Sequence, residues 1–251
     1  MTAGPPVGSL EWGRRTGGRL SADERRALRL AMLRDSRVYA RSRVLQALGR
    51  GPRATRIDLA SLDLPDTALC RAVESAAAQR QSAPMLAHAY RTVAYATALS
   101  QADGVPVDRE LLWCASLLHD VALEHPVQAR CFAVRGGETA EQIALEAGAD
   151  AETAAALGEA VCRHASPALD PRTDPLAYLV SNGALVDVVG KRLDEMEPAS
   201  VAALVAAQTR DGFAPALAAA WRAEARAVPG GRAALAERTV LFSVAARIAP
   251  R

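Results

Sequence analysis

The sequence predicts an all-α protein, and composition and apolar spacing are the observations behind this prediction. Half of the 251 residues are apolar, yet aromatic residues make up only 4% of the chain. Ala and Leu dominate long stretches, whereas runs of the residues that favour strands are scarce. Apolar residues recur mostly at helical spacing. A chain of this length and apolar content can bury a substantial core.

Residues 1–55 are predicted to form a basic N-terminal arm and helix. They hold twelve Arg against four acidic residues, a net charge of +8, so the remainder of the chain carries −6. Gly and Pro recur in residues 1–20, and we expect that stretch to be disordered or loosely packed. Ser21 and Glu24 form a capping box that begins a helix reaching about Leu48. The arm lacks interleaved aromatic side chains, so we expect a solvated or subunit-contact role rather than nucleic-acid binding.

Residues 56–197 are predicted to form the central helical domain. The predicted helices run from Pro65 to about Arg80, from Pro84 to Asp103, from Asp108 through Asp120, from Glu138 to Ala147, from Ala151 to His164, and from Pro175 through Asp187. Gly136 and Gly137 serve as the start signal of the fourth. The third reads ELLWCASLLHDVAL and is apolar on nearly every side, which is typical of a helix in the centre of a domain. The polar pair His119–Asp120 at its end is therefore informative.

Residues 198–251 are predicted to form two or three amphipathic helices that pack on the central domain. Pro215 and Pro229–Gly231 break the pattern between them. The apolar faces Val201–Ala207 and Leu217–Trp221 are of the kind that proteins bury against partners, so we expect a homo-oligomer.

The sequence also predicts the cellular compartment in which the protein resides. No segment approaches eighteen uninterrupted apolar residues, so we expect no membrane-spanning helix. The N-terminus lacks a compact apolar stretch followed by a small-residue cleavage site, so no secretory signal is indicated, and we expect a cytoplasmic protein. The cysteines form no C-x-x-C pair, which favours buried thiols over a zinc knuckle or disulfides. They are Cys70, Cys114, Cys131 and Cys162.

Histidines and carboxylates in predicted buried helices indicate a metal site. A buried ionisable group must be paired, hydrogen-bonded or metal-bound, and any one such histidine alone is best explained as a satisfied core residue. His119 and Asp120 are adjacent, about 100° apart on one helix, and both side chains can reach an ion lodged between helices. Imidazole and carboxylate groups suit zinc, iron and manganese. The predicted ligands of one divalent ion are His88, His119, Asp120 and Asp187.

These segments resemble the motifs of a known family. L-A-H-A-Y-R-T (Leu86–Thr92), L-L-H-D-V-A-L (Leu117–Leu123) and Asp187 in D-V-V-G are similar to the H…HD…D signature of the HD superfamily. Members of this superfamily are metal-dependent phosphohydrolases and related enzymes with an all-helical core. The resemblance covers about residues 60–195 and implies the four-ligand set given above.

Within the superfamily, the sequence resembles the cyanamide-hydratase-like branch most closely. That branch has an N-H-S-x-R-T first motif, an H-D-x-G-L second motif and a stretch like F-E-V-x-G-A-x-x-A. The third of these appears here as F-A-V-R-G-G-E-T-A, from Phe132. The chain departs from the branch at Ala87 and Ala89, which replace Asn and Ser, and at Ala122, which replaces Gly. These changes alter the expected pocket rather than the expected ligands.

The catalytic residues that we predict are Asp120, His164 and Arg91. Asp120 is expected to bind the ion and to aim a water molecule. His164 could act as a base, an acid or a positioning group, although a histidine at a helix C-terminus can also be purely structural. Arg91 lies three residues after His88 on the same helical face and could orient Asp120, bind an anionic substrate or form an ordinary salt bridge. His125 lies in a Glu-His-Pro turn and is expected to be exposed.

The resulting hypothesis is a metal-dependent hydrolase or hydratase that attacks a small substrate. Water activated by the ion would add to a phosphoester or to a nitrile- or amide-like carbon, while His164 or Arg91 stabilises the developing charge. One alternative is a di-iron oxygenase, which needs about two more ligands than the four predicted. The other is a non-catalytic scaffold of the HD type that binds a ligand or partner.

Overall fold

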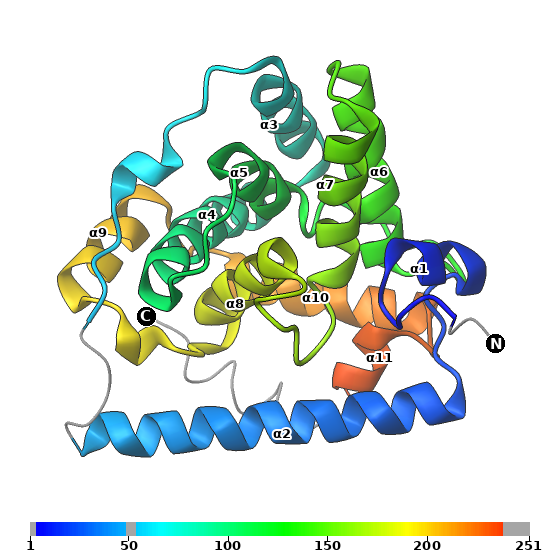
Figure 1. Cartoon of the computed structure of the whole chain (residues 1–251), viewed down its shortest axis with the longest axis horizontal. Coiled ribbons are helices and arrows are strands. Elements are labelled where there is room, and N and C mark those ends of the chain that lie inside the picture. Colours follow the sequence, from blue (N-terminus) through cyan, green and yellow to red (C-terminus); the bar gives the residue numbers. More distant parts are fainter. Residues whose placement is uncertain (1–3, 49–53, 238–251) are drawn as a thin grey trace.

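The computed structural model describes residues 4–48 and 54–237, and these residues are organised as helices α1 to α11 (Figure 1). No β-sheet occurs among them, and the only strand-like pairings are two isolated bridges. The all-α prediction is therefore confirmed. The α-helices are Leu10–Thr16 (α1), Ala22–Ala47 (α2), Ala68–Arg80 (α3), Ala83–Asp103 (α4), Arg109–Leu118 (α5), Phe132–Glu146 (α6), Ala151–Arg163 (α7), Pro175–Val189 (α8), Pro198–Ala207 (α9), Phe213–Ala227 (α10) and Arg232–Glu237 (α11).

The N-terminal residues are more ordered than the sequence predicted. α1 begins at Ser9, whose hydroxyl accepts a hydrogen bond from the Trp12 amide, and ends at Gly17 in the left-handed conformation. Leu10 and Trp12 are each only 4% exposed. The prediction that residues 1–20 are loosely packed is therefore wrong for residues 4–20. Two large apolar side chains outweigh the many Gly and Pro residues around them.

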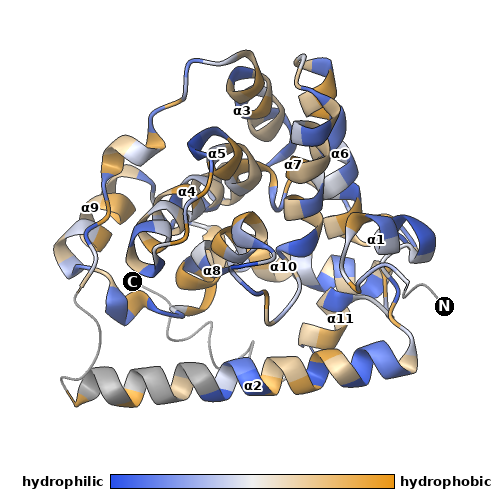
Figure 2. Cartoon of the chain, in the orientation of Figure 1, coloured by the Kyte–Doolittle hydropathy of each residue, from blue (hydrophilic) through white to orange (hydrophobic). Residues whose placement is uncertain are grey.

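Helix α2 runs along one side of the molecule, away from the central helices (Figure 1). The predicted capping box is present, because Ser21 and Glu24 exchange backbone-to-side-chain hydrogen bonds of 2.6 and 3.2 Å. Apolar and polar residues alternate along the coloured, N-terminal part of the helix (Figure 2). The predicted stop at Gly49, Gly51 and Pro52 lies outside the described residues.

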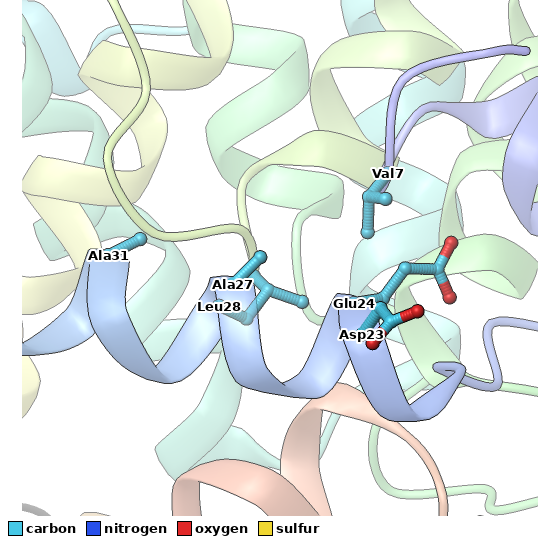
Figure 3. A pocket seen from close by; sticks show the side chains of 6 residues that line it. All are labelled: Val7, Asp23, Glu24, Ala27, Leu28 and Ala31. Carbon is cyan, nitrogen blue, oxygen red and sulfur yellow. The ribbon is translucent and has the colours of Figure 1, made fainter.

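A small apolar cluster attaches the N-terminal segment and α11 to α2. Its buried members are Trp12, Leu20 and Leu235, against which Leu28 and Met32 of α2 pack. Beside it, Val7 faces α2 across a hollow of about 420 Å³ (Figure 3). The hollow is lined by Val7, Asp23, Glu24, Ala27, Leu28 and Ala31.

The central helices pack around one main core. α4 packs against α5 and α8, and α6 packs along α7. This core contains Leu10 of the N-terminal region, and also Leu204, Phe213 and Leu217 of the C-terminal region. Three stretches that the sequence suggested as separate regions therefore share one core. Leu204 and Leu217 are covered within the chain itself, so burying them needs no partner, and the homo-oligomer stays a prediction.

The two glycines in the sixth helix have a different role from the predicted one. α6 begins at Phe132, so Gly136 and Gly137 lie inside the helix rather than before it. A Cβ atom at Gly137 would lie only 2.6 Å from the carbonyl oxygen of Gly158 in α7. The glycines therefore allow two helix backbones to approach closely, a role that turn-based reasoning does not detect.

Two further sequence predictions concern burial and membrane contact. All four cysteines are free and buried, as predicted. None of the described helices has both the length and the apolar content needed to cross a membrane.

Candidate metal centre

His88, His119 and Asp120 come together in the buried interior of the protein. His88 lies on α4, His119 is the C-cap residue that follows α5, and Asp120 comes directly after it. One ligand atom from each lies within 4.8 Å of the others. The Nε2 atoms of His88 and His119 are 3.1 Å apart, and Asp120 Oδ2 lies 3.3 Å from the second and 3.9 Å from the first. The structure thus brings together three of the four predicted ligands.

The backbone turns at the end of α5 place the side chains of His119 and Asp120 in the core. The helix ends at Leu118, and tight turns follow, closed by hydrogen bonds from Val121 N to Leu118 O and from Leu123 N to Asp120 O. His119 is 1% exposed and Asp120 is 5% exposed. A charged carboxylate this deeply buried needs a compensating positive charge or several hydrogen bonds.

The histidine side chains are held by their Nδ1 atoms. His88 Nδ1 lies 2.7 Å from Asp187 Oδ2, and His119 Nδ1 lies 2.7 Å from the carbonyl oxygen of Ser116. A carbonyl or carboxylate oxygen can only accept, so the proton of each neutral ring is on Nδ1. The Nε2 atoms then present lone pairs to the space that they share. Metal-binding histidines are fixed in this way in other proteins.

Burial and neighbouring charges set the protonation of the group. Burial acts to raise the pKa of Asp120, but His119 and then His164 outweigh it and hold that pKa well below its usual range. Burial lowers the pKa of His88, which favours its neutral, ligand-competent form. Burial also acts to lower the pKa of His119, yet the charge of Asp120 outweighs it and the net shift is upward.

The donor set fits a divalent cation. When both rings are neutral, their Nε2 atoms at 3.1 Å are both acceptors, and either a cation between them or a proton on His119, whose pKa is raised, removes that conflict. Asp120 supplies a negative charge on the same side. Two imidazoles and a carboxylate suit several transition metals, so the group does not select one ion.

Asp187 lies beside this group rather than in it. Its carboxylate contacts His88 at Nδ1, the ring nitrogen other than the one that faces His119. It also accepts hydrogen bonds from Arg91 Nε and Nη2 at 2.9 and 2.7 Å, and from Arg210. Burial acts to raise the pKa of Asp187, but His88 and Arg91 outweigh it, and the carboxylate stays ionised. Sequence spacing placed this residue near the site but did not reveal these partners.

Arg91 is fully buried, and among its predicted roles its contacts match the ordinary salt bridge. Its guanidinium pairs with Asp187 rather than with Asp120. Its remaining nitrogen, Nη1, donates to the carbonyl oxygens of Gln208 and Thr209 at 3.2 and 2.6 Å. All three guanidinium nitrogens of Arg91 therefore have partners within the protein, and the geometry supports the salt-bridge alternative.

The loop between α9 and α10, together with the first residue of α10, supplies residues that sequence reasoning missed. Arg210 donates to the backbone oxygen of Asp187 at 2.8 Å as well as to its carboxylate. Phe213 stacks on the His88 ring with centroids 4.6 Å apart, and the guanidinium groups of Arg91 and Arg210 lie over the Phe213 ring. No local motif links this loop to His88. The Arg-Asp-Gly sequence before Phe213 was the one available signal. It predicts a turn, but it does not predict which residues that turn contacts.

His164 and His125 occupy different environments. His164 follows α7, is 7% exposed, and its Nε2 lies 3.6 Å from Asp120 Oδ1. Its Nδ1 lies 2.6 Å from the carbonyl oxygen of Val161, so it is held like His119. His125 is exposed, as predicted, and contacts the carbonyl oxygen of Arg80.

Comparisons with known proteins add no assignment. No protein-family model matches the sequence, and no curated protein matches it significantly. The chemistry of the buried side chains is therefore the basis for any functional proposal.

Proposed function

We propose that this chain is a metal-dependent hydrolase or hydratase of the HD type that acts on a small substrate. The observation that carries the proposal is the convergence of His88 Nε2, His119 Nε2 and Asp120 at the buried end of α5. The H…HD motif spacing supports it, because these residues are the ones that the resemblance implies. A buried group with fixed Nε2 lone pairs and an ionised carboxylate is costly unless it serves binding.

The chain's own residues would bind the ion and keep it accessible. His88, His119 and Asp120 would hold one divalent cation, zinc, iron or manganese, which supplies the Lewis acidity that brings the pKa of water towards about 7. Asp187 would keep the His88 ring oriented through Nδ1. Asp120 and His164 are the more exposed members of the group, so the substrate would approach from their side.

The first experiment tests metal binding and hydrolysis together. The full chain, loaded separately with Zn²⁺, Mn²⁺ or Fe²⁺, should bind about one ion by elemental analysis. It should also hydrolyse one of three probes: a nitrophenyl phosphate monoester, the corresponding diester or cyanamide. Asp120→Ala and the near-isosteric Asp120→Asn should lose both bound metal and turnover, by at least about 100-fold, since they remove the one ligand that carries charge.

A matched control and three outcomes make the test decisive. His125→Ala removes an exposed histidine and should retain metal and activity, with circular dichroism melts verifying that all variants fold. Full metal content and activity in a folded Asp120→Asn would refute the proposal. Two irons per chain with oxygen-dependent turnover would favour the di-iron oxygenase. Failure of the folded wild type to bind any divalent ion would favour the non-catalytic scaffold.

A further inference from the structure

We infer that His164, and not Asp187, is the fourth protein ligand of the ion, and that Asp187 acts as the orienting partner of His88. This inference rests on the proposed metal site and changes its composition. The ligand set becomes three imidazoles and one carboxylate: His88, His119, His164 and Asp120.

Charge balance argues that Asp187 is not a ligand. Its single negative charge already faces two guanidinium groups, those of Arg91 and Arg210, and all three side chains are buried or nearly so. A divalent cation on the same carboxylate would meet two fixed positive charges at short range in a medium of low dielectric constant. Asp120, in contrast, has only histidines as ion-pair partners among the residues that the structure describes. The cation is therefore attracted to Asp120.

Geometry also argues against Asp187. Its carboxylate binds Nδ1 of His88, whereas the ring presents Nε2 to His119 and Asp120. An ion held by Nε2 therefore has the His88 ring between itself and Asp187. A carboxylate that accepts from the second nitrogen of a metal-bound imidazole is the common orienting arrangement.

His164 has the features of a ligand that Asp187 lacks. Val161 O fixes the proton of its ring on Nδ1, so Nε2 carries the lone pair, and that atom lies 3.6 Å from Asp120 Oδ1. Its ring makes an edge contact with His119, with centroids 5.1 Å apart. His164 Nε2 approaches Asp120 from the oxygen opposite to the one near His119. His164 lies outside the group of three residues whose ligand atoms are all within 4.8 Å of one another, so an ion held by all four residues would draw His164 inward.

The larger ligand set constrains the ion. Four protein ligands would fill the coordination shell of tetrahedral zinc and leave no position for water. Activity then requires an ion that accepts five or six ligands, such as Mn²⁺ or Fe²⁺. Occupation by zinc is expected to give a bound but less active protein.

Cadmium-113 NMR on protein labelled with ¹⁵N-histidine counts the imidazole ligands directly. The full chain is titrated with ¹¹³Cd²⁺, and each Nε2 resonance is assigned by single His→Gln variants. We expect ¹¹³Cd–¹⁵N coupling at His88, His119 and His164 and none at His125, the internal control. Coupling at only two histidines would overturn the inference while leaving the proposed metal site intact. No coupling and no bound cadmium in the folded protein would overturn both.

The Asp187→Asn variant tests the other half of the inference. Because Asn can still accept from His88 Nδ1, this variant should keep one cadmium per chain and all three couplings, with affinity about 10- to 100-fold weaker. His164→Gln should lose its coupling and weaken cadmium binding more than Asp187→Asn does. If a folded Asp187→Asn lost cadmium while His164→Gln kept it, Asp187 would be the ligand and the inference would be wrong.

Discussion

Glu224 is a single buried carboxylate whose two oxygens have unequal environments. Oε1 accepts a hydrogen bond of 2.8 Å from the Phe132 amide at the start of α6. Oε2 makes no hydrogen bond with the described residues, and Arg135 lies 3.8 Å from it. Burial therefore raises the pKa of Glu224, although the Phe132 amide and Arg135 oppose the shift.

This raised pKa predicts how stability depends on pH. The folded state keeps the Glu224 proton to a higher pH than the unfolded state does. The stabilisation is therefore complete below the ordinary carboxyl pKa and is lost as pH rises through the raised value. Glu224→Gln stays neutral and can still accept from Phe132, so it should avoid that loss. Urea unfolding from about pH 4 to pH 8 should show the variant gaining stability relative to wild type as pH rises. A difference that is constant with pH would contradict the assignment.

The sequence predicted individual site residues well where two potential metal ligands are neighbours in the chain. His119 and Asp120 are consecutive polar residues at the end of an apolar helix, so their burial and convergence follow from local pattern. Arg210 and Phe213 could not be found in this way, since only the path of the loop after α9 brings Arg210 to Asp187 and Phe213 to His88. The orientation of the His88 ring depends in turn on Asp187, about a hundred residues further along the chain.

At the scale of elements, the crossing of α6 and α7 depends on two facing glycines. A Cβ at Gly137 would meet Gly158 O at 2.6 Å, and a Cβ at Gly158 would meet Gly137 O at 2.8 Å. Neither oxygen belongs to a flexible side chain that could move aside. The crossing positions α7, whose C-terminal end carries His164.

This crossing predicts an inverted effect of alanine. In an ordinary helix interior Gly→Ala stabilises by up to about 1 kcal/mol. Gly137→Ala should instead destabilise by about 1–3 kcal/mol, because the backbones must separate. Gly136→Ala is the matched control, since its Cβ would meet mainly a Val161 methyl group at 3.3 Å. Equal denaturation midpoints for the two variants would refute the close-approach interpretation.

Helix periodicity predicted most elements but not their exact starts. Capping residues gave the beginning of α2, and Gly104 gave the end of α4. α6 was predicted to start too late, because a Gly pair is also a turn signal and sequence cannot distinguish a turn from a close backbone contact. α3 begins at Ala68 after the Thr67 cap rather than at Pro65.

At the scale of the whole molecule, a small second cluster holds the N-terminal segment, α2 and α11 together. Trp12 is its largest buried side chain, and its indole nitrogen donates to Glu24 at a distance of 2.9 Å. The order of residues 4–20, which Gly and Pro content obscured, depends on this cluster and on Leu10 in the main core.

Trp12→Ala should therefore loosen the periphery without dismantling the centre. Loss of a buried Trp costs about 3–5 kcal/mol, and we expect faster proteolysis within α1 and α2. Bound metal should remain near one ion per chain, because the site lies in the main core. Trp12→Phe keeps the ring packing and should show a smaller effect. If Trp12→Ala lost the bound metal as well as the protease resistance of α2, the small apolar cluster and the main core would unfold as one unit.

The pairing of Asp187 with two arginines also constrains which amino-acid substitutions this chain can accept. A change that removes the carboxylate leaves two guanidinium groups buried together, one of them fully enclosed, with no negative charge between them. Positions 91, 187 and 210 should therefore covary among descendants of this sequence, and an Arg at position 210 without an acid at position 187 should be rare.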